Sequence, residues 1–260
     1  MNFMIVLGLL VSIISVVLGV PGIQSTFHIY LDPYSFVMVF GATVGSAMMS
    51  ASFKDFWAMI QILTGWVYLR NRSVSHYDVL LKLVEVAEKA SRNGKQSVLD
   101  LGKGFGDGFL DRALTLMGSG LEMEFVRRTL ETDITEEKRR HASIAALIRS
   151  MGSFAPMFGM MGTVIGIVML LQNVTDINSV VSGMSLALIT TLYGIILSAI
   201  FFIPITNKLK YLSTKDSISK EMIMEGVLAI MDNQIPLKVE KMLMSYISTR
   251  SKERLLQVKQ

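Results

Sequence analysis

The sequence has no cysteine, and it has few histidines, prolines and charged residues for its 260 positions. Without cysteine there is no disulfide framework, no thiolate nucleophile and no sulfur metal site. The three histidines, His28, His76 and His141, lack metal-ligand spacing, so we assign no catalytic residue, metal or cofactor. Only 18% of the residues are charged, below the ~25% of soluble domains, whereas 51% are hydrophobic. This composition indicates a membrane protein.

Charge is missing entirely from four long apolar stretches. Each is close to the ~20 residues that the hydrocarbon core of a bilayer requires. The four stretches are Met4–Val20, Tyr34–Phe53, Gly152–Val174 and Val180–Ile205. We therefore predict an all-α integral membrane protein with four transmembrane helices. No positively charged region precedes the first stretch, so we interpret it as a retained span and not as a signal peptide.

The basic residues predict how the chain is oriented in the membrane. Of the 25 Lys and Arg residues, 15 lie within Lys54–Arg149 and 10 within Lys208–Lys259. The positive-inside rule places both segments in the cytoplasm, and an even number of spans then places the N-terminus there too. The net charge of +4 is thus a feature of topology, and nucleic-acid binding is not indicated.

Four parts follow from this topology. Both cytoplasmic parts show helical spacing of apolar residues, as in the run from Leu80 to Ala90 that stops at Asn93-Gly94. The expected parts are transmembrane helices one and two (1–53), a large helical cytoplasmic insertion (54–150), transmembrane helices three and four (151–206) and a helical cytoplasmic tail (207–260). We expect the tail helices to pack on the insertion.

Small residues repeat every three or four positions along the third and fourth stretches, which predicts that other helices approach closely. The two stripes are Gly152, Pro156, Gly159, Thr163 and Gly166, and Gly183, Ala187, Thr191, Gly194 and Ser198. Thr163 and Thr191 fall within about one helical turn of the same depth. Two interpretations stay open: each hydroxyl bonds a carbonyl one turn back, or the two line a shared path for a cation. No stretch contains a carboxylate, so an ion path would need one from a partner helix.

Two prolines lie near the cytoplasmic side of these stretches. We expect Pro156 in the first turn of the third span and Pro204 at the inner end of the fourth. Simple helix ends and a hinge that transmits motion inward are equally compatible with the two positions.

Several motifs together resemble one membrane protein family. They are Ala-Pro-Met-Phe-Gly-Met-Met-Gly-Thr-Val-Ile-Gly at 155–166, Ala-Leu-Ile-Thr-Thr-Leu-Tyr-Gly at 187–194, Ile-Pro-Ile-Thr-Asn-Lys-Leu at 203–209 and Leu-Asp-Pro-Tyr-Ser at 31–35. With the four-span layout, they closely resemble the MotA/PomA flagellar stator family within the MotA/TolQ/ExbB proton channel superfamily. The resemblance covers nearly the whole chain and is weakest in the insertion and the far tail.

This resemblance implies a stator subunit of the bacterial inner membrane that carries out no covalent chemistry. Such subunits form a homo-oligomer, a pentameric ring, around MotB or PomB, whose single span supplies the ion-binding aspartate. Flow of H⁺ or Na⁺ turns the ring, which pushes on the rotor protein FliG. Thr163 and Thr191 resemble the paired threonines of sodium-type members, and Asp32 resembles an external acid of those members, which favours Na⁺ slightly.

Further residues carry over from the family by position. Pro156 and Pro204 resemble the two prolines that couple ion passage to cytoplasmic movement. Arg92 and Asp100 stand eight residues apart, as do the rotor-facing Arg and Glu of the family, with Asp here in place of Glu. Charge-pair steering of a rotor protein and ordinary surface charge explain Arg92 and Asp100 equally well.

Two other functions compete with the stator interpretation. An ExbB/TolQ-like energiser of outer-membrane processes is expected to have three spans, in contrast to the four predicted here. A membrane scaffold without an ion path predicts that replacing Thr163 or Thr191 by alanine changes packing alone. A stator predicts instead a loss or an altered ion dependence of motility.

Overall fold

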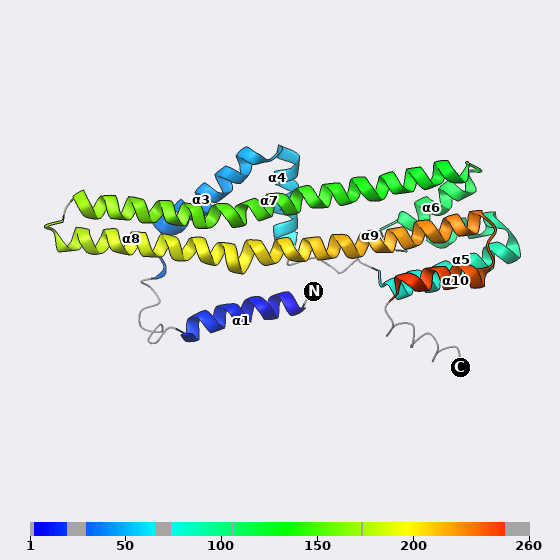
Figure 1. Ribbon diagram of the computed structural model, residues 1–260, viewed down its shortest axis with the longest axis horizontal. Helices are drawn as coiled ribbons and strands as arrows, with labels where there is room; N and C mark the ends of the chain where they lie inside the picture. The colour runs from blue at the N-terminus through cyan, green and yellow to red at the C-terminus, as the bar shows by residue number, and fades with distance from the viewer. Residues whose placement is uncertain (1–2, 20–29, 66–73, 106, 173, 248–260) are drawn as a thin grey trace. The chain divides into compact units, whose positions relative to one another are not determined.

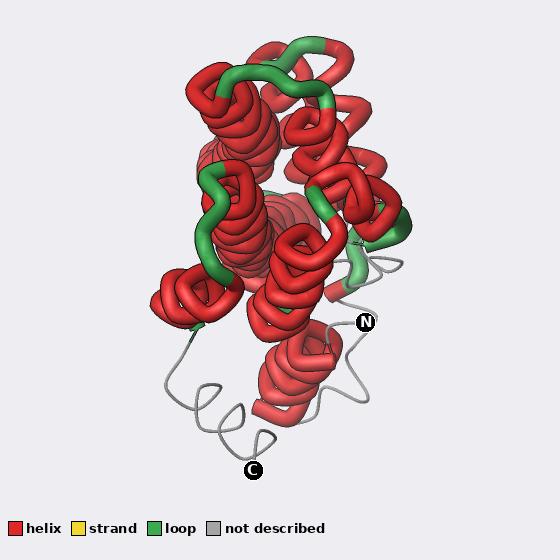
Figure 2. The backbone as a smooth tube through the Cα atoms, turned by 90° about the vertical axis from the view of Figure 1, so that its right-hand side faces the viewer, coloured by secondary structure: helices red, strands yellow, loops and turns green. Residues whose placement is uncertain are grey.

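The computed structural model describes residues 3–19, 30–65, 74–105, 107–172 and 174–247 (Figure 1). Over these residues the backbone forms helices joined by loops, and Figure 2 shows no strand among them. The all-α class is therefore confirmed. The chain divides into two compact units. Unit 1 comprises Met1–Asn71 and Ala142–Lys210, and unit 2 comprises Arg72–His141 and Tyr211–Gln260.

Unit 1 contains the apolar helices. They are α1 (Phe3–Gly19), α3 (Pro33–Ser50), α4 (Phe53–Gly65), the latter part of α7 (Met123–Gln172), α8 (Ile177–Ile196), a π-helical turn η3 (Leu197–Phe202) and the start of α9 (Ile203–Met231). Among the described residues, two helices are long and apolar enough to cross a membrane, Met123–Gln172 and the continuous run Ile177–Met231, and Leu7–Gly19 is a shorter apolar helix. The four-span topology stays a prediction.

The second predicted span runs three residues beyond the helix that it matches. Helix α3 ends at Ser50 because Ala51 adopts an extended conformation. The hydroxyl of Ser52 then accepts the N–H of Asp55 and donates to its carboxylate, which caps the start of α4. The cap at Ser52 thus separates α3 from α4. A prediction based on the absence of charge could not detect this break, because Ser52 is uncharged.

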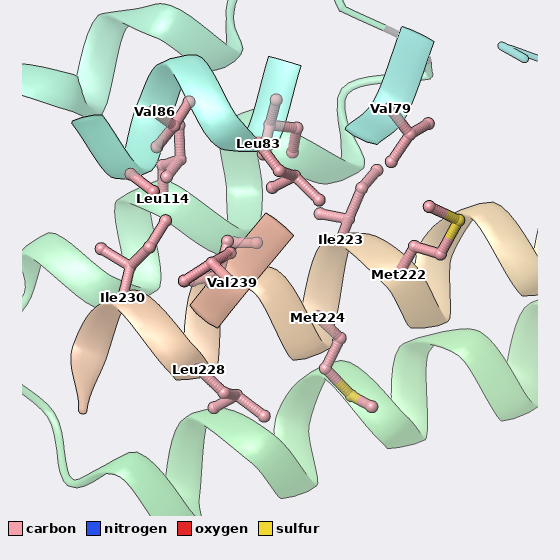
Figure 3. Close-up of a cluster of buried hydrophobic side chains, with 14 of the residues drawn as sticks. Val79, Leu83, Val86, Leu114, Met222, Ile223, Met224, Leu228, Ile230 and Val239 are labelled. Carbon is pink, nitrogen blue, oxygen red and sulfur yellow. The ribbon is translucent and has the colours of Figure 1, made fainter. Parts of the chain in front are cut away.

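Unit 2 has a hydrophobic core of its own. Its elements are α5 (His76–Asn93), η2 (Lys95–Gly102), α6 (Phe109–Gly118), the first part of α7, the latter part of α9, α10 (Pro236–Leu243) and η4 (Met244–Tyr246). Figure 3 shows Leu83 of α5, Leu114 of α6, and Ile223 and Ile230 of α9 within this cluster, in which all four are buried. Helix α5 ends at Asn93 as predicted, because Gly94 follows it with a φ of +84°.

The tail packs as the sequence predicts. Gly226 of α9 lies so close to α5 that a Cβ at this position would come within 2.8 Å of the side chain of Leu83. Helix α10 begins at Pro236, in the first turn, where the missing N–H costs nothing. Its residues Val239 and Leu243 are fully buried in the same core.

Candidate functional site

Helices α7 and α8 touch backbone to backbone along their small residues (Figure 1). A Cβ on Gly166 would lie 2.5 Å from the carbonyl oxygen of Gly183, and one on Gly194 would lie 2.6 Å from that of Ala155. Both distances are below van der Waals contact, so only glycine fits. The predicted close approach is confirmed, and the two stripes face each other.

The hydroxyls of the two predicted threonines bond to different carbonyls. Thr163 donates to Met160 of its own helix at 2.5 Å. Thr191 lies 3.1 Å from the carbonyl of Ala187 in its own helix and 3.4 Å from that of Gly159 in α7. The intrahelical bond left open by the sequence is therefore present for both, and Thr191 also reaches across the helix pair.

A third threonine, which the sequence analysis did not single out, is the most buried of the group. Thr190 is fully buried, and its hydroxyl donates to Leu186 at 2.7 Å. Gly162 makes room for it, since a Cβ there would lie 2.3 Å from the Thr190 oxygen. The sequence signal that could have identified Thr190 was a glycine in α7, Gly162, together with two successive threonines in α8. The small-residue stripe of α8 contains Thr191 alone, whereas both Thr190 and Thr191 lie against α7.

Neither proline lies at a helix end. Pro156 is inside α7, so the interpretation of this proline as a simple helix end is wrong. The reason is that α7 begins at Met123, well before the apolar stretch. Pro204 follows η3 within a helical run that continues from Ile177 to Met231. A π-helical turn before a proline lets the chain stay helical where the proline offers no N–H.

Asp32 caps the N-terminus of α3. Its carboxylate accepts the backbone N–H groups of Tyr34 and Ser35 and the hydroxyl of Ser35. The Ser35 hydroxyl is the largest cause that holds the pKa of Asp32 below its ordinary value, with the two backbone N–H groups adding to it. Asp32 is thus an ionised helix cap, a structural role that its Asp-Pro-Tyr-Ser sequence could have indicated.

Tyr193 ties the chain before α3 to α8. Its hydroxyl donates to the carbonyl of Tyr30 at 2.6 Å and accepts the N–H of Asp32 at 3.0 Å. Its ring also meets the ring of Phe36 edge-on, with centroids 5.8 Å apart. The position of Asp32 is therefore fixed by the same helix that carries Thr191.

Asp176 repeats the cap at the start of α8. Its carboxylate accepts the hydroxyl of Ser179 and the N–H groups of Asn178 and Ser179. The hydroxyl of Ser179 is the main cause that lowers the pKa of Asp176. Asp32 and Asp176 are thus both N-caps, of α3 and α8. Residues 20–29, which precede Asp32 in the chain, lie outside the described residues.

Arg92 and Asp100 both lie on the surface of unit 2. Arg92 is in the last turn of α5, where a cation favours the helix C-terminus, and Asp100 is in η2. Asp100 pairs with Lys103, and a hydrogen bond from that ammonium group lowers the pKa of the Asp100 carboxyl. Arg92 and Asp100 are accessible to a partner. In the described part of the chain, no three His, Asp or Glu side chains group closely enough to hold a metal ion.

Comparisons with known proteins identify the family. The model of the MotA/TolQ/ExbB proton channel family matches residues 103–224. Chemotaxis protein PomA of Vibrio alginolyticus is 30% identical over 93% of this chain and 92% of its own length. Motility protein A of Borreliella burgdorferi is 34% identical over 84% of each chain. A chain of the solved C. jejuni MotAB structure has the same fold, with a TM-score of 0.86 at 22% identity over 96% of this chain and 97% of that one. This chain therefore belongs to the MotA/PomA family of flagellar stator subunits.

Proposed function

We propose that this chain is the ring-forming subunit of an ion-driven flagellar stator. A homo-oligomeric ring, pentameric as in the family, surrounds a MotB/PomB-type partner and converts ion flow into torque. The observation that carries the proposal is 30% identity to PomA over 93% of the chain, together with 34% identity to a motility protein A. The solved MotAB structures add the fold.

The proposed location is the bacterial inner membrane, with four spans and both termini in the cytoplasm. Two long apolar helices and one shorter apolar helix support it, as does α3, which has 18 residues and no charge. Side chains such as Val164 on α7 and Leu188 on α8 are more than 60% exposed within this chain, which suits a surface covered by lipid or by other subunits. Unit 2, with the charged helices, would face the rotor.

In this proposal, Thr191, Thr163 and Asp32 line the ion path, and the partner supplies the ion-binding carboxylate. Support comes from the position of the Thr191 hydroxyl, 3.4 Å from the Gly159 carbonyl. Hydroxyl and carbonyl oxygens can replace water around Na⁺ or carry protons through bound water. The threonine pair favours Na⁺. The prolines Pro156 and Pro204 would couple ion passage to movement, and Arg92 and Asp100 would face FliG.

Swimming speed in a host without its own stators tests this function. The host expresses this chain together with the MotB/PomB-type partner that is native to the chain. Swimming speed is measured over a range of sodium concentrations at fixed pH, with and without a proton uncoupler. We expect speed to rise with sodium and to survive the uncoupler. Speed that ignores sodium and stops with the uncoupler would assign H⁺ instead.

Immotile cells that still assemble both subunits would contradict the stator function.

The variants Thr163→Ala and Thr191→Ala test the ion path in the same swimming assay. An ion path predicts a shifted sodium dependence for them, whereas a purely packing role predicts unchanged dependence.

Substitutions of Asp32 separate its cap from its proposed role in the ion path. Asp32→Asn keeps one side-chain oxygen for the N-cap and loses the charge, so we expect a small loss of stability of the purified chain while the sodium dependence of swimming shifts. Asp32→Ala removes the cap and should also cost about 1 kcal/mol of unfolding free energy. Because the pKa of Asp32 is lowered, the charged cap stabilises above the ordinary value of 3.8, and this contribution is lost as pH falls through the lower native pKa.

Denaturant titration of the purified chain and swimming assays measure the two properties independently. Asp176→Asn, at the equivalent cap of α8, is the matched control and should leave the sodium dependence unchanged. If Asp32→Asn swims with the wild-type sodium dependence, Asp32 is a cap alone.

A further inference from the structure

Pro156 leaves one buried carbonyl of α7 without a donor from its own helix. A proline has no N–H, so the carbonyl four residues earlier, that of Gly152, loses its helical hydrogen bond. Gly152 is buried. A buried carbonyl without a partner is unfavourable, so the fold must supply another donor.

The hydroxyl of Ser198 is that donor. Its Oγ lies 2.6 Å from the carbonyl oxygen of Gly152, and only 6% of Ser198 is exposed. Other buried hydroxyls of the chain, such as those of Thr206 and Ser217, bond a carbonyl of their own helix. Ser198 instead completes the hydrogen-bond ladder of the neighbouring helix at the point where a proline interrupts it.

The main chain of Ser198 is engaged with the second proline site. Ser198 lies in η3, and its carbonyl accepts the N–H of Ile203, five residues later and directly before Pro204. This is the widened bond of a π-helical turn. A single residue therefore bonds through its side chain to the site of Pro156 and through its carbonyl to the turn that precedes Pro204.

The helices are closely packed on both sides of Ser198, so no other donor can readily replace its hydrogen bond to Gly152. One turn before Ser198, a Cβ on Gly194 would lie 2.6 Å from the carbonyl oxygen of Ala155. One turn after Ser198, Phe202 packs on α7, since a Cβ on Gly152 would lie 3.3 Å from the Cβ of Phe202. The helices are already in contact here, so loss of the hydroxyl would leave the Gly152 carbonyl unpaired.

We propose that Ser198 is a positioning residue that joins the two proline sites. Its hydrogen bond holds the interrupted turn of α7 against the π-helical turn before Pro204. A change in the packing of α7 on α8 therefore displaces both sites together. This inference rests on the proposed function, in which the two prolines couple ion passage to movement.

Infrared spectroscopy of the full-length complex tests the bond directly. The chain is labelled with ¹³C at the glycine carbonyls, and the variants are Ser198→Ala, Pro156→Ala and the double variant. We expect Ser198→Ala to move one ¹³C carbonyl band to higher wavenumber, since the Gly152 carbonyl becomes free. In the Pro156→Ala background the same change should have no effect, because the N–H of residue 156 again reaches Gly152. An unmoved band, or an equal shift in both backgrounds, overturns the proposal.

Torque per stator tests the consequence. Assembled stators are counted by fluorescence on tethered cells, and torque is measured on the same cells. We expect Ser198→Ala to assemble in wild-type numbers and to lose torque several-fold. Ser217→Ala is the matched control, because Ser217 is equally buried at 6% and bonds its own helix. Equal torque in Ser198→Ala and the wild type would contradict the proposed role of Ser198 but not the proposed stator function. A wild-type chain that generates no torque would contradict the proposed function as well.

Discussion

Gly166→Ala should force α7 and α8 apart, destabilise the subunit and abolish its function. The new Cβ would lie 2.5 Å from the carbonyl oxygen of Gly183 and 2.8 Å from the backbone nitrogen of Ala187. Both are backbone atoms of α8, which cannot rotate away as a side chain can, so the helices must move apart. We expect a loss of about 3 kcal/mol of unfolding free energy, the upper end for overpacking, despite the better helix propensity of alanine.

Denaturant titration of the purified chain and the amount of subunit in membranes measure this loss. Gly41→Ala is the matched control in α3, since beyond its chain neighbours and the backbone of its own helix no heavy atom lies within 4 Å of its Cβ position. It should be neutral or slightly stabilising in the isolated chain. Equal stability of the two variants would show that the contact between α7 and α8 is looser than the structure has it.

Lys220→Met should destabilise unit 2 strongly. The Lys220 side chain is 6% exposed, and its ammonium group bonds Glu137 of α7 at 2.6 Å and Asp216 of α9 at 2.7 Å. Removing the cation leaves two carboxylates close together without their partner. We expect a cost of about 3 kcal/mol, the low end for breaking a buried ion pair, because both carboxylates keep some contact with water.

The control for this prediction is Lys89→Met. Lys89 pairs with Glu85 on the exposed face of α5, so its loss should cost at most about 0.5 kcal/mol. Comparable losses for the two variants, measured by denaturant titration, would contradict a special role for Lys220.

The stabilisation by Lys220 should also depend on pH in a defined direction. Burial alone would lower the pKa of Lys220, but the hydrogen bonds to Asp216 and Glu137 outweigh it and raise the pKa. The contribution is therefore fully present below the ordinary lysine value of 10.5 and is lost as pH rises through the higher native pKa. The stability difference between the wild type and Lys220→Met should be constant near neutral pH and shrink only in strong alkali.

Much of the fold could be predicted because it depends on local patterns. The apolar spacing and the Asn93-Gly94 stop predict α5 and its end, and Pro236 marks the start of α10. The small-residue stripes predict a close helix contact, which α7 and α8 make. These features are set by residues within a few turns of one another, so the sequence displays them directly.

The features that could not be predicted depend on residues far apart in the chain. Ser198 and Gly152 are 46 positions apart, and no local pattern pairs a hydroxyl with a particular carbonyl. Lys220 resembles any surface lysine until α9 places it against Glu137 of α7. That Thr190 lies against α7 together with Thr191 depends on the rotation of α8, which periodicity fixes only to within about one residue.

The backbone contact between α7 and α8 also has a mechanical consequence. Two helices that touch at Gly166 and Gly183 resist sliding and bending, much as two rods bonded along their length are stiffer than either alone. Compliance is then greatest where the hydrogen-bond ladder is interrupted, at Pro156 and at the π-helical turn before Pro204. Elastic deformation under load would concentrate at this one level of the helix pair, and the glycine-packed segment would move as a rigid lever arm.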